Sequence, residues 1–504
     1  MEHAARTVEK QPAGPQPVKL AIESVDFFMR NMIMRMPFRY GNACLTASPL
    51  LHVRLRARGT DGEHVEGVSA DILPPKWFDK STGKNYRQNI DELVRTARIG
   101  AKAWLDAASL PKAPFAIWRE AHTAATSAAK QGGLNALTGS FGSSLIERAM
   151  LDAAGKLMNA DFHAMARENH LGVNPETIHP ELDGRSLGNA VMKQPLSRIH
   201  VRHTVGLGDP IYKEDVPASE RLDDGLPQSL AECVKTHQLR YFKVKVHGRL
   251  DKDLERLGRI ATLLEVAAPA DYKISLDGNE QFKEPQQLAD WLTAVSGQTV
   301  LREFMKHVSY IEQPLDRDVA LTAAGASTFA DFPNLPPVII DESDDDLHSF
   351  KRAAALGYRG VSVKNCKGVF KGLLNLMLTQ LYNEEGDTRY LLTGEDLCNQ
   401  PLVPLQQDLC ALSVLGVDHA ERNGHHYGGT LGHLSLEELN QCLEVHAALY
   451  EQFQRSARLS IHNGQLDLSS LRQPGFGVGM ITDFRSMTPL DDWEYDSLGL
   501  DDNI

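Results

Sequence analysis

The sequence predicts an α/β protein with two main domains, a parallel β/α barrel that follows an N-terminal α+β domain. From about residue 195, short apolar runs alternate with amphipathic segments, which is typical of parallel strands joined by helices. Before that point, strand-like runs are followed by helical ones. A chain of 504 residues is also too long for one ordinary core, so two domains are expected.

The first 194 residues are predicted to contain a tail and the α+β domain. Residues 1–17 are polar, include Pro and Gly, and lack an apolar segment, so we expect a disordered tail and no signal peptide. Residues 18–75 show the apolar spacing of antiparallel strands, interrupted by loops at 36–41 and 67–75. From about 91 to 187 the pattern is helical, and Ser144 with Glu147 matches a capping box that would begin a helix.

Eight strands are predicted in the barrel domain, residues 195–430, and an active site would lie at their carboxyl ends. The predicted strands are 199–205, 241–246, 273–277, 308–312, 338–341, 360–364, 390–393 and 418–422. The alternative, an open doubly wound sheet, calls for a glycine-rich turn after its first strand, and the sequence has none there. The C-terminal segment, 431–504, begins with a predicted helix at 434–456 and is expected to pack back on the N-terminal domain.

Composition argues against several classes of protein. The net charge of −13, without a dense Lys/Arg stripe, argues against a nucleic-acid partner. No apolar run approaches the roughly 20 residues that span a bilayer, so we expect no membrane segment. The six cysteines are dispersed without a CxxC pair, which indicates a reducing, cytoplasmic location and argues against disulfides or a zinc site. A homo-oligomer is expected, because closed symmetric assemblies are common.

Three acidic residues end successive predicted strands: Asp277, Glu312 and Asp341. They lie about one β/α unit apart, so a barrel would bring them side by side at one rim. Clustered carboxylates repel one another unless a cation neutralises them, and oxygen ligands favour Mg²⁺, with Mn²⁺ as the alternative. Glu342 follows Asp341 directly, and either could be the third ligand, although we favour Asp341. The competing interpretation, helix caps or salt-bridge partners, suits a single acid better than three in register.

Lysines flank these acids. Lys243 and Lys245 share one face of the second predicted strand, and Lys364 ends the sixth, across the barrel. Lysines inside a barrel are costly unless they face a polar site, and a depressed pKa would let one act as a base. The set predicts removal of the proton beside a metal-bound substrate carboxylate through an enediolate. The second lysine would return a proton from the other face or assist departure of a β-substituent.

Two further motifs are weaker candidates. Glu395, after the seventh predicted strand, could orient a lysine, contact substrate or cap a helix. His425 and His426, near the eighth strand, are interpreted as rim structure or a substrate contact, with structure favoured.

In these motifs the chain resembles the enolase superfamily, in particular the mandelate racemase/muconate lactonizing enzyme family. The resemblance covers about residues 195–430 and rests on Lys243-Val-Lys245, Leu276-Asp277-Gly-Asn279, Ile311-Glu312-Gln-Pro314, Ile340-Asp341-Glu-Ser343 and Val363-Lys364-Asn-Cys-Lys367. It implies a (β/α)7β TIM-like barrel with an α+β capping domain. Two departures are the Lys367-Gly-Val sequence and additional helical residues at about 76–137.

The resemblance also implies roles for individual residues. It implies Asp277, Glu312 and Asp341 as Mg²⁺ ligands, and Lys245 and Lys364 as the acid/base pair. Lys243 would tune Lys245 and contact the substrate carboxylate. Loops 35–42 and 67–75 would close the site, and the expected substrate contacts there and on the barrel are Arg39, Tyr40 and Glu395.

Three functions fit these expectations. A racemase or epimerase of a small carboxylate substrate is favoured, because lysines on both faces permit 1,1-proton transfer. The second is a lyase, either an acid-sugar dehydratase or an enzyme of the o-succinylbenzoate synthase type. The third, a barrel that binds but does not catalyse, fits less well with a full set of ligands and bases.

Overall fold

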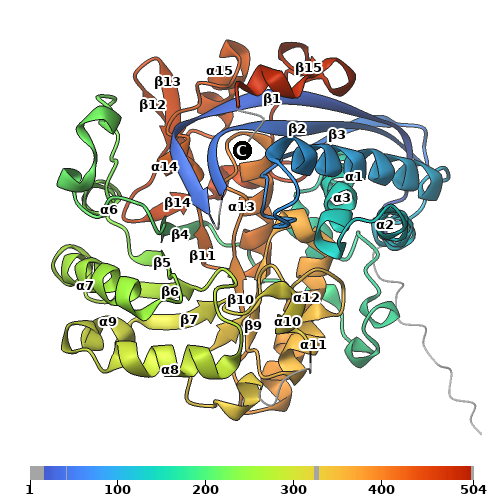
Figure 1. Cartoon of the computed structure of the whole chain (residues 1–504). Coiled ribbons are helices and arrows are strands. Elements are labelled where there is room, and N and C mark those ends of the chain that lie inside the picture. The colour runs from blue at the N-terminus through green and yellow to red at the C-terminus, as the bar shows by residue number, and fades with distance from the viewer. Residues whose placement is uncertain (1–15, 41–42, 323–327, 501–504) are drawn as a thin grey trace, which may run out of the picture.

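The computed structural model describes residues 16–40, 43–322 and 328–500, and its centre is a barrel of parallel strands (Figure 1). The barrel strands are β4 (Arg198–Val205), β5 (Tyr241–Lys245), β6 (Lys273–Asp277), β7 (Val308–Glu312), β8 (Val338–Ile339), β9 (Gly360–Val363), β10 (Leu391–Gly394) and β11 (His419–Glu421). Their order is β8-β7-β6-β5-β4-β11-β10-β9, and a parallel bridge between Ile340 and Val361 joins β8 to β9. The predicted barrel is confirmed, and the open sheet is excluded.

Helices surround the barrel because each buries an apolar face on it. On α7 (Leu250–Ala267), the buried residues Leu257, Ile260, Ala261 and Leu264 recur at the spacing of one helix face. The other helices of this region are α6 (Leu230–His237), α8 (Pro285–Ser296), α9 (Arg302–Lys306), α10 (Arg317–Ala320), α11 (Ser349–Ala355), α12 (Val369–Glu385), α13 (Val403–Leu415) and α14 (Gly424–Tyr427). Helix α13 is buried on all sides, because the N-terminal domain covers its outer face.

The N-terminal domain lies over one end of the barrel (Figure 1). Its antiparallel sheet contains β1 (Leu20–Tyr40), β2 (Ala43–Gly59) and β3 (His64–Ile72), and its helices are α1 (Tyr86–Ala107), α2 (Pro114–Gln131), α3 (Ala136–Leu157), α4 (Phe162–Arg167) and α5 (Leu187–Ala190). Helices α1 and α2 occupy most of the predicted helical addition at 76–137.

The predicted loops of this domain are largely wrong. Residues 36–40 belong to β1, because Phe38 pairs with Leu45 after an irregular register shift that accommodates the turn-forming residues. Residues 67–72 belong to β3, which leaves only 73–75 of that loop outside a strand. Residues 41–42 and most of the predicted tail, 1–15, lie outside the described residues.

The capping box predicted at Ser144 is also wrong, because α3 begins earlier, with Asn135 as its N-cap. Ser144 lies inside the helix, where its hydroxyl donates to the carbonyl of Cys366 at 2.8 Å. Glu147 accepts a hydrogen bond of 2.6 Å from the amide of Phe370, in the first turn of α12. Both side chains therefore tie the capping domain to the segment that follows Lys364, and Glu147 caps a helix other than its own.

The C-terminal segment contacts both domains. Strand β14 (Gln465–Asp467) pairs with barrel strand β4, whereas β15 (Thr488–Pro489) pairs with β1. The helix predicted at 434–456 is shorter: α15 (Leu436–Val445) gives way to a hairpin of β12 (Tyr450–Phe453) and β13 (Ser456–Leu459). Glu438 on α15 forms a buried ion pair of 2.8 Å with Arg30 on β1.

Across the part of the chain that the structure describes, no helix combines the length and apolarity needed to cross a membrane.

Burial of Glu147 predicts a pH-dependent stability. Burial raises the pKa of its carboxyl from 4.5 to about 8. The pKa is higher in the folded than in the unfolded protein. The contribution of Glu147 to the stability of the folded state is therefore full below pH 4.5 and is lost as the pH rises through about 8. We expect the free energy of unfolding to fall over this window by on the order of a few kcal/mol more in the wild type than in Glu147→Gln.

Denaturant unfolding at a series of pH values measures this difference. The matched control is Glu265→Gln on the exposed face of α7, which should keep the wild-type pH dependence. Identical pH dependence in Glu147→Gln and the wild type would contradict the prediction.

Candidate active site

A cavity of about 540 Å³, including its open mouth, lies where the carboxyl ends of the barrel strands meet the capping domain. The barrel supplies most of the charged lining, and the capping domain supplies Lys80 and an aromatic part. The lining residues are Phe38, Tyr40, Pro74, Trp77, Lys80, Lys243, Lys245, Asp277, Asn279, Asp341, Glu342, Lys364, Asp396, Leu397, Cys398, Glu421 and Asn423.

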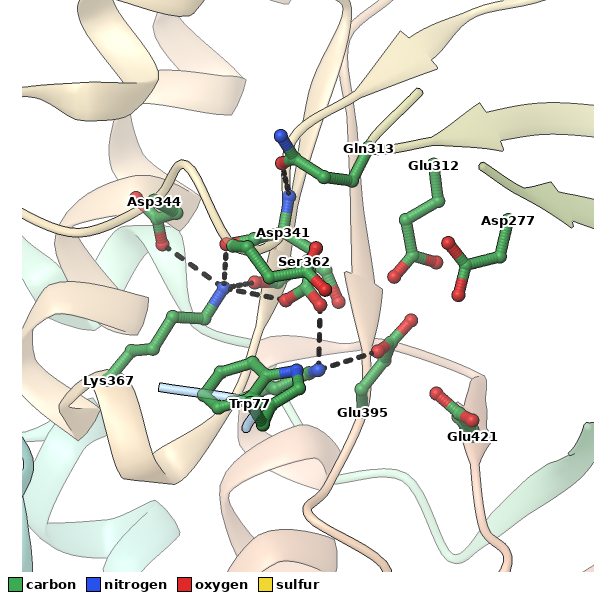
Figure 2. Close-up of polar contacts among 12 residues, drawn as sticks. Trp77, Asp277, Glu312, Gln313, Asp341, Asp344, Ser362, Lys367, Glu395 and Glu421 are labelled. Carbon is green, nitrogen blue, oxygen red and sulfur yellow. Dashed lines mark hydrogen bonds and ion pairs between the residues drawn. The ribbon is translucent and has the colours of Figure 1, made fainter. Parts of the chain in front are cut away.

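Buried carboxylates converge at the bottom of this cavity. Asp277 and Glu312 are direct partners on β6 and β7, so their side chains emerge side by side from the strand ends. Figure 2 shows these two facing Glu395 and Glu421 from the opposite wall. One carboxylate oxygen from each of Glu312, Asp341 and Glu395 lies within 4.8 Å of the others. Asp277 and Glu421 are outside that group but adjoin it. We refer to the five acids together, Asp277, Glu312, Asp341, Glu395 and Glu421, as the carboxylate ring.

The carboxylate ring is buried, where several ionised carboxylates are unfavourable without a counter-charge. Burial and the charge of Glu395 raise the pKa of Glu312 well above its ordinary value. The Oε2 atom of Glu312 is buried and has no hydrogen-bond donor among the described residues. Oxygen-only ligands with an unsatisfied buried atom fit a hard divalent cation such as Mg²⁺ or Mn²⁺.

Lys243 provides positive charge inside the carboxylate ring. Its Nζ lies 2.8 Å from carboxylate oxygens of Glu312, Glu395 and Glu421, and 3.1 Å from Asp277. Burial opposes its charge, but the surrounding acids raise its pKa well above the ordinary value. Lys243 therefore offsets part of the negative charge of these acids, a contact that comes in addition to its predicted roles toward Lys245 and the substrate.

Lys245 and Lys364 lie on opposite sides of the cavity. Strands β5 and β9 are separated by three strands in either direction around the barrel, so these side chains enter from facing walls. Lys245 donates to Asn279 at 2.7 Å and lies 3.9 Å from Asp277. Lys364 pairs with Asp341 at 2.8 Å and with Glu395 at 3.0 Å.

The protein groups around Lys364 raise its pKa, whereas the depression that we predicted applies to a lysine beside a metal ion. Burial would lower the pKa of its ammonium group, but Asp341 and Glu395 outweigh burial and raise it well above the ordinary value. Its Nζ also lies 4.4 Å from the ring centroid of Trp77, a cation–π contact that holds the lysine from the capping side.

Asp341 is more firmly positioned than its neighbour Glu342. The side-chain oxygen of Gln313 accepts hydrogen bonds from the amides of Asp341 and Ser343, at 2.8 and 3.1 Å. Glu342 turns toward Lys80, 3.7 Å away. Although burial alone would raise the pKa of Glu342, Lys80 and other cations lower it to about 2. This arrangement favours Asp341 over Glu342 as the third ligand.

The capping domain contributes residues that the sequence pattern only partly identified. Tyr40 lines the cavity as expected, and its hydroxyl donates to the carbonyl of Pro75 at 2.8 Å. Arg39 is exposed and is not part of the lining, because neighbours on a strand point to opposite sides. Trp77 and Lys80, in the segment after β3, were not predicted.

Two barrel residues were also missed. Glu421 ends β11, whereas the strand that we predicted at 418–422 ends one residue later. The rule that selected Asp277 and Glu312, an acid at the end of a strand, therefore passed over it. Lys367 donates to the carbonyl of Ser362 at 2.6 Å and lies 3.1 Å from Asp341 Oδ1 (Figure 2). The sequence analysis placed Lys367 in a motif but gave it no role, because its contacts depend on the turn after β9.

Comparison with known proteins finds a shared fold. No family model and no curated protein sequence matches this chain. Among solved structures, a mandelate racemase/muconate lactonizing protein from Herpetosiphon aurantiacus matches with a TM-score of 0.55 and 16% identity. The match covers 92% of this chain and 99% of that one.

Two further structures of this fold contain ligands. A dipeptide epimerase from Enterococcus faecalis, complexed with Mg and the dipeptide L-Leu-L-Tyr, is 13% identical over 91% of this chain and 99% of its own, with a TM-score of 0.55. An enolase from Bradyrhizobium, complexed with magnesium and mandelic acid, is 14% identical over 93% and 97%, also with a TM-score of 0.55. At these identities the likeness shows that the barrel and its capping domain form a known fold.

Because Lys243 contacts several buried acids, we predict that a divalent cation recovers part of the stability lost when Lys243 is removed. Lys243→Met should lower the free energy of unfolding by about 3–5 kcal/mol, because it leaves buried acids without a counter-charge. Mg²⁺ should recover part of that loss by binding the folded state. The matched control is Lys371→Met, which removes another buried lysine, paired with Asp344 at 3.0 Å outside the carboxylate ring. Chemical denaturation with and without Mg²⁺ checks this, and equal recovery in both variants would contradict it.

Proposed function

We propose that this protein is a Mg²⁺-dependent enzyme of the enolase superfamily that removes the proton beside a substrate carboxylate, as a racemase or epimerase. The observation that carries the proposal is the placement of Lys245 and Lys364 on facing walls, with the carboxylate ring between them. Structures of the same fold contain magnesium with a dipeptide or with mandelic acid, which supports this class of ligand.

We assign the cation to Asp277, Glu312 and Asp341, with Glu395 close enough to contribute. The donor set fits, since all these groups are carboxylates and Glu312 Oε2 is buried without a donor in the described part of the chain. When bound, Mg²⁺ would supply positive charge for the substrate carboxylate and its enediolate, and would weaken the acids' hold on the lysine protons.

The lysines carry the proton transfer. Lys245 Nζ is oriented by Asn279 Oδ1, and Lys364 Nζ by Asp341 and by the face of Trp77. One lysine takes the proton from one face of the substrate carbon, and the other returns a proton to the opposite face. Because the bases face each other, each should act on one stereoisomer, which is what a racemase or epimerase requires.

The capping domain indicates the kind of substrate. Phe38, Tyr40 and Trp77 give the upper wall an aromatic surface, and Leu397 extends it on the barrel side. A small carboxylate that carries an apolar or aromatic group next to the reacting carbon therefore fits best. Dipeptides, N-acyl amino acids and aromatic 2-hydroxy acids are the compounds to test.

Stereospecific isotope exchange tests the proposal. In D₂O with Mg²⁺, the wild type should incorporate one deuterium into both stereoisomers of its substrate. Lys245→Ala should lose exchange by about 10²–10⁴-fold with one stereoisomer, and Lys364→Ala with the other, because each removes one general base. Mass spectrometry of the recovered substrate, with chiral separation, measures both rates.

The control is Lys273→Ala, which removes an exposed lysine at the opposite end of β6 and should exchange like the wild type. Loss of water from the substrate would assign the protein to the lyase class. Full exchange in both Lys245→Ala and Lys364→Ala would exclude the mechanism, and the absence of any exchange or turnover, with metal binding retained, would indicate a binding protein.

A further inference from the structure

A second group of metal-binding side chains lies outside the barrel, between β4, α6 and α14. On β4, Arg202 pairs with Glu395 and Thr204 bonds Glu421, so both of these side chains point into the barrel. His203 lies between them and must point outward. There it meets Cys233 from α6 and His426 from α14, and all three are buried.

The three side chains are close enough to share one ion. One ring nitrogen of each histidine and the sulfur of Cys233 all lie within 4.8 Å of one another. The Cys233 sulfur is 3.5 Å from Nδ1 of His426, and the rings of His203 and His426 are 5.0 Å apart. A modest side-chain adjustment would bring these atoms to the metal distances of about 2.0–2.3 Å typical of nitrogen and sulfur ligands.

Some polar atoms in and beside this group have no partner among the described residues. Nδ1 of His203, whose side chain is 2% exposed, has no hydrogen-bond partner within the described ranges. The same holds for both ring nitrogens of His425, whose ring lies 5.6 Å from that of His203. Buried polar atoms without partners are costly, so a purely structural packing of histidines leaves them unexplained. Burial also lowers the pKa of His203 to about 3, which keeps its imidazole neutral.

We propose that His203, Cys233 and His426 form a second metal site, for a divalent cation of the zinc class, with His425 beside it as a further imidazole. Imidazole nitrogen and thiolate sulfur are ligands that zinc prefers, whereas the all-oxygen carboxylate ring suits Mg²⁺. Binding converts the Cys233 thiol to a thiolate and releases its proton to solvent. The closed, buried position indicates a structural site.

The position of the site suggests what the metal would stabilise. Helix α14 directly follows the cavity residues Glu421 and Asn423, so a metal on His426 would fix the end of β11. The carbonyl of His426 also accepts a hydrogen bond of 3.3 Å from Arg35 on β1 of the capping domain. Arg35 is neutralised by its ion pair with Asp224, so it opposes a nearby cation only weakly.

Metal binding by the full-length protein tests this inference. Protein stripped with EDTA is titrated with Zn²⁺ against a chromophoric chelator, in excess Mg²⁺ to occupy the carboxylate ring. Cys233→Ser should bind Zn²⁺ at least about tenfold more weakly, which is the loss that even an indirect metal contact can cause. With Co²⁺, the wild type should show a thiolate-to-cobalt charge-transfer band that Cys233→Ser lacks.

Two controls separate this site from other thiols and from the carboxylate ring. Cys442→Ser removes a buried cysteine on α15 and should retain both the affinity and the band. Glu312→Gln should weaken Mg²⁺ binding without changing Zn²⁺ affinity. If Cys233→Ser does not fold, His203→Gln replaces it, with the same expected loss of Zn²⁺ affinity. Wild-type Zn²⁺ affinity in the folded variant, or no thiolate band in the wild type, would overturn the inference.

Discussion

The barrel brings several carboxylates together at one end, and the groups around them must offset the repulsion among these acids. Asp277, Glu312 and Glu395 each have a carboxylate oxygen within 3.1 Å of Lys243 Nζ, in a place that water barely reaches. Such a group is stable only with positive charge at its centre, because burial weakens solvation and strengthens repulsion. In this structure Lys243 supplies part of that charge, and Lys364 and Arg202 also pair with Glu395. The same acids would serve a divalent cation. Charge balance thus links the stability of the barrel to its chemistry.

The capping domain completes what the barrel begins. Trp77 covers Lys364 from above, and Ser144 and Glu147 hold the segment that leads from Lys364 into α12. One lysine is therefore positioned by two domains, whereas Lys245 depends on its neighbour Asn279 within the barrel. The aromatic wall of the cavity comes from the capping domain, so in the proposed mechanism substrate selection and proton transfer would be divided between the domains.

The barrel could be predicted from the sequence because its signals are local. Regular alternation of strands and helices, and acids such as Asp277 and Glu312 at strand ends, are visible without three-dimensional information. The hairpin of β1 and β2 could not be predicted in full, since turn-forming residues at 36–41 suggested a loop. In the structure, residues 36–40 belong to β1, which pairs irregularly with β2 there. The sequence also did not indicate that His203, Cys233 and His426 lie together, because Cys233 and His426 are 193 residues apart and meet only when α6 and α14 pack together. Contacts of this kind leave no spacing to recognise.

The central claim is that the carboxylate ring holds one hard divalent cation between two facing lysines. Anomalous diffraction from crystals grown with Mn²⁺, which is a substitute for Mg²⁺ in oxygen sites, tests it most directly. The account predicts one strong peak within about 2.0–2.6 Å of oxygens from Asp277, Glu312 and Asp341, with the Lys243 ammonium displaced from its central position. A map without a peak there, and with Lys243 still in contact with the same acids, would contradict it.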